Sequence, residues 1–104
     1  MTTIPQGLHD SARAFALKLL DRHSHLHLEL EAYQPGHADD HTEPGSLYVV
    51  IPATTSRSEE ITLTVQSTEA LLRSGDRERL FIWPVPEQSL AHEEVLSALA
   101  AALA

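Results

Sequence analysis

Residues 23–33 read His-Ser-His-Leu-His-Leu-Glu-Leu-Glu-Ala-Tyr, so that apolar and polar side chains alternate along most of the stretch. Successive side chains of a β-strand point to opposite faces, and the alternation therefore predicts one strand over this whole range. One face would carry leucines, and the other would carry histidines and glutamates. We expect the leucine face to pack on helices and the polar face to lie on the open side of a sheet.

Helices are predicted at both ends of the chain. Residues 4–22 carry apolar side chains at helical spacing, and Thr3 and Gln6 fit a capping box at the start of this segment. Residues 87–103 repeat the helical spacing and are rich in alanine, the residue with the highest helix propensity. Each helix has one apolar stripe that must be buried against another element.

Three more strands and a short helix are predicted between these ends. Residues 46–53 and 79–85 are apolar on both faces, whereas residues 60–67 alternate and should have one polar face. Residues 68–75 resemble a short helix, with Thr68 as its N-cap and Gly75 just past its last turn. The expected order is therefore helix, strand, strand, strand, short helix, strand, helix.

This order favours a single α+β domain over residues 1–104, because a chain of 104 residues is long enough for one core. No long crossover helix links neighbouring strands, so the four-stranded sheet should be mainly antiparallel. The two terminal helices would cover one face of the sheet in a two-layer arrangement. Residues 34–45 contain Pro, Gly and Asp in a connection that is long for a hairpin loop.

The uncovered sheet face is the first candidate for a binding surface. Strands that are apolar on both faces would place aromatic side chains there, and aromatic residues are favoured at protein interfaces. The candidate partner-binding residues are Tyr48, Phe81 and Trp83, together with Leu17, which does not fit the stripe of its helix. Alternatively, one helix crosses to the other face and these residues are ordinary core.

Composition excludes several classes of function. The formal net charge is −8, and such an acidic chain is a poor ligand for nucleic acid phosphates. There is no cysteine, which excludes disulfides, thiolate metal sites and cysteine nucleophiles. The sequence has no apolar run of the roughly 20 residues that a bilayer span requires, and no signal-peptide pattern at its start. We expect a cytoplasmic protein that does not bind membranes.

Histidines are the second candidate site, since the chain has seven of them. On a strand over 23–33, alternate histidines would share one face at a spacing of roughly 7 Å, which lets two imidazoles bind one metal ion. Imidazole and carboxylate ligands suit zinc or another first-row divalent ion. The metal-ligand candidates are His25, His27, Glu31, His37 and His41. A solvated polar strand face is the simpler interpretation of the same pattern.

Two other interpretations of the histidines stay open. Clustered imidazoles could make partner binding depend on pH, because their reference pKa of about 6.5 is close to neutrality. His92 differs from the others, because it falls within the apolar stripe of the last predicted helix. A histidine in that position is more often a core residue with a hydrogen-bonded ring than a ligand.

The sequence favours a small acidic protein-binding module without enzymatic activity. Nucleophile elbows and phosphate-binding glycine loops are absent from the sequence. Secretion chaperones, toxin immunity proteins and small inhibitors share this size, acidity and α+β layout, which is an analogy of class and not a motif. The expected partner is another protein, for which basic residues would suit the acidic chain, or a second copy of the chain. The alternative is a histidine-rich domain that binds a divalent metal or another ligand.

Overall fold

The computed structural model describes residues 4–33, 45–54 and 58–103. The first helix, α1, spans Asp10–Arg22 and leads into a five-stranded sheet. A short 3₁₀ turn, η1 at Val85–Glu87, then precedes the last helix, α2 at Gln88–Leu103. The strands are β1 Glu29–Ala32, β2 Leu47–Ile51, β3 Ile61–Val65, β4 Glu69–Ser74 and β5 Arg77–Ile82.

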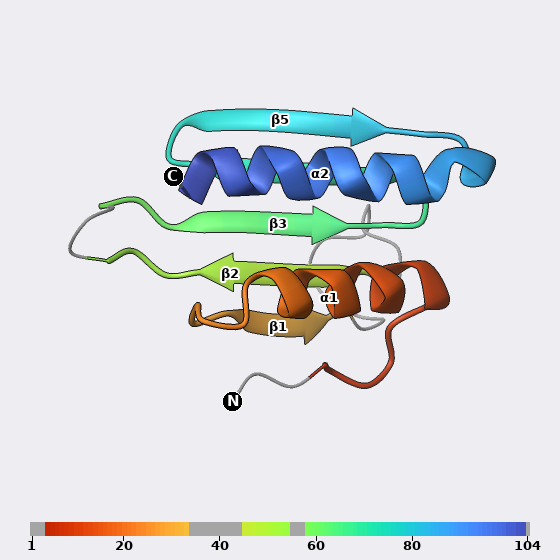
Figure 1. The fold of residues 1–104 in the computed structure, drawn as a ribbon, viewed down its shortest axis with the longest axis horizontal. Coiled ribbons are helices and arrows are strands. Elements are labelled where there is room, and N and C mark those ends of the chain that lie inside the picture. The colour runs from red at the N-terminus through yellow and green to blue at the C-terminus, as the bar shows by residue number, and fades with distance from the viewer. Residues whose placement is uncertain (1–3, 34–44, 55–57, 104) are drawn as a thin grey trace.

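The sheet is a meander in which the strands lie in the order β1-β2-β3-β4-β5, and every neighbouring pair is antiparallel. Figure 1 shows α1 and α2 side by side on one face, with α1 over β1 and β2 and α2 nearer β5. This confirms the α+β class, the antiparallel sheet and the placement of both terminal helices on one face. β1 and β5 are the two edges of the sheet.

The sheet has five strands and not the predicted four, because residues 69–74 form β4 instead of a helix. Ala70 and Leu72 alternate with Leu71, so the first two are buried towards the helices. An isolated helix of this length would be costly to nucleate and would pair with nothing. As a strand, the same backbone bonds to β3 on one side and β5 on the other.

The turn at Gly75 also differs from the prediction. Ser74 and Arg77 pair with each other, so Gly75 and Asp76 form a two-residue hairpin loop between β4 and β5. Gly75 has a φ of +62°, a conformation that L-residues with a side chain rarely adopt. The glycine that was expected to end a helix therefore closes a β-hairpin, because both structures need a positive φ at this position.

The first strand is much shorter than the alternating pattern predicted. α1 ends at Arg22, His23 occupies its C-cap position, and β1 begins only at Glu29. The intervening residues turn the chain from the helix into the sheet, which a continuous strand over 23–33 could not do. The predicted faces are nevertheless confirmed for the part that is strand, since Glu29 and Glu31 are exposed whereas Leu30 and Ala32 are partly buried.

The start of α1 differs from the prediction, whereas the bounds of α2 agree with it to within one residue. α1 starts at Asp10, and its N-cap is His9, whose Nδ1 accepts a hydrogen bond from the N–H of Ala12 at 3.1 Å. The predicted start at residue 4 is wrong, and Thr3 lies outside the described residues. α2 begins one residue after the predicted position and ends at the predicted Leu103.

The core lies between the two helices and the sheet face that they cover. Its largest fully buried side chains include Phe15 and Leu19 from α1, and Leu96 and Leu99 from α2. Alternate residues of the central strands meet them, as the buried positions of β2 and β3 show. An ion pair also joins the helices, because Arg22 donates two hydrogen bonds to the Glu93 carboxylate at 2.6 and 2.8 Å.

Candidate functional site

The sheet face that lies opposite α1 and α2 is called the open face here. Its central feature is a row of side chains that face one another across all five strands. The register places Glu31 beside Tyr48, Tyr48 beside Thr64, Thr64 beside Leu71, and Leu71 beside Leu80. Within the described parts of the chain, no helix packs on this row.

The row changes in character from one edge of the sheet to the other. Glu31 at the β1 edge is exposed, and Tyr48 and Leu71 in the middle are partly exposed. Leu80 at the β5 edge is 54% exposed, and its neighbour on the same face, Ile82, is 73% exposed. The open face therefore combines a carboxylate, hydroxyl groups and aliphatic side chains along one line.

Tyr48 is an aromatic residue of the open face. Its ring meets that of Tyr33 edge to face, with centroids 6.0 Å apart. Partial burial raises the pKa of the Tyr48 hydroxyl, and Tyr33, Glu60 and Glu31 raise it further, whereas Arg73 acts in the opposite direction. The hydroxyl therefore stays protonated near neutral pH and can donate a hydrogen bond.

One end of the open face is hollowed and acidic. Carboxylates gather there around the Arg73 guanidinium, in a depression of about 400 Å³. Arg73 donates to Glu78, which faces it across β4 and β5. The remaining lining residues are Glu59, Glu60, Thr62, Gly75 and Asp76. The acids outnumber the arginine, so this end of the face is negatively charged.

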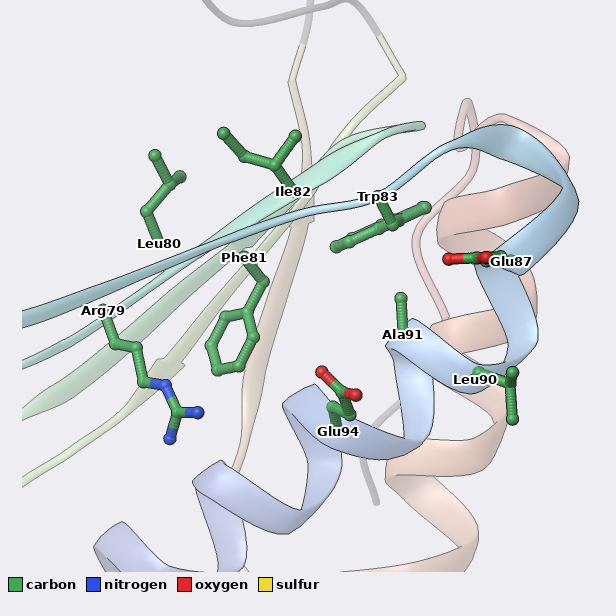
Figure 2. Close-up of a pocket in the computed structure, with 9 residues that line it drawn as sticks. All are labelled: Arg79, Leu80, Phe81, Ile82, Trp83, Glu87, Leu90, Ala91 and Glu94. Atoms are coloured by element: carbon green, nitrogen blue, oxygen red, sulfur yellow. The ribbon is translucent and has the colours of Figure 1, made fainter.

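A groove runs between β5 and the start of α2. Phe81, Trp83 and Ala91 form its floor, and it encloses about 480 Å³. Figure 2 shows Phe81 pointing towards α2, whereas Leu80 and Ile82 point away from that helix. The charged residues that line the groove are Arg79, Glu87 and Glu94. Leu90 also lines the groove and is 71% exposed.

Two of the four predicted partner-binding residues lie on the covered face, so their expected place on the open face is wrong. Phe81 and Trp83 are only 8% and 5% exposed, and α2 covers them. The two rings bury more apolar surface against α2 than Leu80 and Ile82 would, because aromatic side chains are larger. Leu80 and Ile82 take the open-face positions that were predicted for the aromatic pair. The strand is apolar on both faces, and this pattern allowed either pair to face the helices.

The other two predicted partner-binding residues are accessible but lie on different layers. Tyr48 is on the open face, as predicted. Leu17 is 55% exposed on α1, whose buried positions belong to other residues. A flat contact with the open face would therefore include Tyr48 and leave Leu17 outside.

The structure does not place the predicted metal ligands on one strand face. His25 and His27 lie in the connection between α1 and β1, whereas Glu31 lies within β1. His37 and His41 are outside the described residues. Among the residues that the structure describes, no three His, Asp or Glu side chains gather in a way that could hold a metal ion.

His23 and His92 are at least partly buried among neighbouring side chains. The rings of His23 and His25 lie 6.3 Å apart, and the pKa of His23 is lowered by burial, and further by His25 and Arg22. His92 is 1% exposed, which confirms its predicted place in the core. The hydrogen bond expected of such a histidine is not found at its Nε2, which is buried without a partner.

Neither described helix combines the length and apolarity needed to cross a membrane. Comparisons with protein-family models, with curated proteins and with solved structures found no significant match to this chain.

Proposed function

We propose that this protein is a small acidic protein-binding module without enzymatic activity, and that it contacts its partner through the open face. The observation that carries this proposal is the row from Glu31 to Leu80, which crosses every strand on a face that no described helix covers. Such a row offers a partner several side chains on one rigid scaffold, with little conformational entropy left to lose on binding.

The electrostatics of the open face favour a partner with basic residues at one end of the contact. The acidic depression around Arg73 lies on this face, and the chain as a whole carries a net charge of −8. Complementary charge would speed association and would make binding weaken as salt is added. The aliphatic side chains nearer β5 would supply the apolar part of the contact.

Site-specific photo-crosslinking in the source cells tests this function. A photoreactive amino acid replaces Tyr48 in one variant, Leu71 in a second and Leu17 in a third. The third variant is the matched control, since Leu17 is exposed on the helical layer. We expect the same partner protein to be crosslinked from positions 48 and 71 and not from position 17. Crosslinks from position 17 alone would contradict the proposal.

Binding measurements with the purified partner complete the test. Leu71→Asp places a charge in the middle of the row and should weaken binding at least about tenfold, which corresponds to roughly 1.4 kcal/mol. Leu17→Asp should leave the affinity unchanged. Affinity should also fall with rising salt concentration, and a salt-independent affinity would exclude the acidic end from the contact.

A further inference from the structure

The free edge of β5 offers a set of backbone hydrogen-bonding groups. The backbone N–H of Trp83 donates to the carbonyl of Thr68 at 2.9 Å, so the backbone N–H and C=O groups of Trp83 are directed towards β4. Backbone groups of an antiparallel strand alternate between its two sides. Glu78, Leu80 and Ile82 therefore direct their N–H and C=O groups away from β4, and Figure 1 shows no helix or strand beyond β5 on that side.

The opposite edge of the sheet is protected in ways that β5 is not. β1 has only four residues, and its exposed side chains are Glu29 and Glu31. Short length and like charges both discourage a strand from pairing with another chain. β5 has six residues and carries Leu80 and Ile82 as its most exposed apolar side chains. Of the two edges, β5 is the one suited to pairing.

Symmetry restricts how β5 could pair with a second copy of itself. Facing residues of an antiparallel pair lie on the same sheet face, so a two-fold axis must lie midway between the two copies of one residue. An axis at Arg79 would bring two arginines together, and an axis at Leu80 would set Glu78 against Ile82. An axis at Phe81 sets Leu80 of each copy against Ile82 of the other, which matches apolar side chains on the open face.

The same axis gives favourable partners on the covered face. Arg79 of each copy would face Trp83 of the other at the edge of the covered face. Within one chain, Arg79 lies over the Phe81 ring at 4.7 Å. The axis also brings Arg79 towards the groove end that carries Glu87, and opposite charges would then meet across the interface.

We infer that two copies of this chain associate through antiparallel pairing of their β5 strands about an axis at Phe81, which makes one continuous ten-stranded sheet. The open faces of the two copies become a single surface, and the exposed side chains of Leu80 and Ile82 come together at its centre. This association uses the backbone edge of β5, whereas the proposed partner contact uses the open face and shares only the side chains nearest that edge. The mass of the chain alone reports the association without the partner, so either can fail without the other.

The oligomeric state of residues 1–104 tests the inference by size-exclusion chromatography with light scattering. At concentrations up to several hundred micromolar, the wild-type chain should approach twice its mass of 11.4 kDa. Ile82→Glu should return the mass to that of one chain, because it replaces an apolar cross-strand contact with a carboxylate beside Leu80 of the other copy. Leu17→Glu, at an exposed position on α1, should stay dimeric. A monomeric wild type, or a dimer that Ile82→Glu leaves intact, would overturn the inference.

Disulfide trapping tests the register, since the natural chain has no cysteine. Leu80→Cys and Ile82→Cys are made as separate single variants and then mixed under oxidising conditions. An axis at Phe81 predicts rapid disulfide formation between the two different variants, because residues 80 and 82 then face each other. Efficient self-linking of Leu80→Cys alone would place the axis at Leu80 and would overturn the proposed register. Circular dichroism confirms that each variant is folded.

Discussion

The indole ring of Trp83 and the imidazole ring of His92 meet edge to face, with centroids 5.7 Å apart and planes at 88°. The His92 ring also meets the ring of Phe15 edge to face, with centroids 5.2 Å apart. One histidine of α2 therefore joins α1 to the last residues of the sheet. The ring is surrounded by apolar groups, and burial is the main reason that its pKa falls to about 4.

Stability should fall in mild acid because of His92. Its pKa is lowered to about 4 in the folded chain from an ordinary value of 6.5. The unfolded chain therefore binds a proton that the folded chain does not bind between these values. The contribution of the neutral His92 ring to the free energy of unfolding is fully present above pH 6.5, and it is lost as the pH falls towards 4. The loss amounts to about 3 kcal/mol at most.

Urea unfolding of the wild type and of His92→Leu between about pH 7 and pH 4.5 measures this effect. The free energy of unfolding should fall less steeply for the variant, because leucine has no proton to gain. Leucine also removes the buried Nε2 atom that has no hydrogen-bond partner. Parallel curves for the two proteins would show that His92 does not cause the acid sensitivity.

Trp83→Phe should destabilise the fold although both residues are aromatic. The Trp83 Nε1–H donates to the Ser67 carbonyl at 3.1 Å, and phenylalanine cannot make that bond. The smaller ring also leaves space under α2. We expect a loss of about 1–3 kcal/mol in the free energy of unfolding. Ile82→Ala, at the exposed neighbouring position, is the control and should change stability by less than about 0.5 kcal/mol in the monomer.

Gly75→Ala should weaken the hairpin between β4 and β5. The φ of +62° at this position costs an alanine about 1–2 kcal/mol. A Cβ atom would also crowd the Glu59 carboxylate, which is flexible enough to move. Gly75→Asn is the matched variant, because asparagine tolerates positive φ better than alanine does. Thermal unfolding should rank wild type above Asn, and Asn above Ala. Equal stability of the two variants would show that crowding, and not backbone conformation, determines the cost.

His9→Ala should remove the cap of α1. The Nδ1 atom of His9 accepts a hydrogen bond from the N–H of Ala12, and alanine leaves that donor without its acceptor. The expected loss is about 1 kcal/mol in the free energy of unfolding. His9→Asn keeps a capping group and should retain most of the stability. If His9→Asn is as unstable as His9→Ala, the ring acts through its packing and not through the cap.

Several features could be predicted from local patterns because they depend on neighbouring residues. The helical spacing of residues 87–103 predicted α2 to within one residue. Alternation over 60–67 predicted β3 together with its covered face. The acid-rich composition and the absence of cysteine also need no structure. In each of these segments, local propensity and the final environment favour the same conformation.

Other features depend on contacts between distant residues. The segment 69–74 has helix-forming residues, yet β3 and β5 bind its backbone on both sides and make it a strand. The histidine run is split because the chain must turn between α1 and β1. The candidate site changed for the same reason, since Phe81 and Trp83 are buried and Leu80 and Ile82 are exposed.

The sequence by itself determined the class of the fold, the two terminal helices and the leucine face of the first strand, since periodicity and composition are local properties. Only the tertiary structure decided which face of β5 meets the helices. A strand that is apolar on both sides has no local preference between its faces. The register with β4 makes the choice by setting Phe81 against the small, buried Ala70 beneath α2.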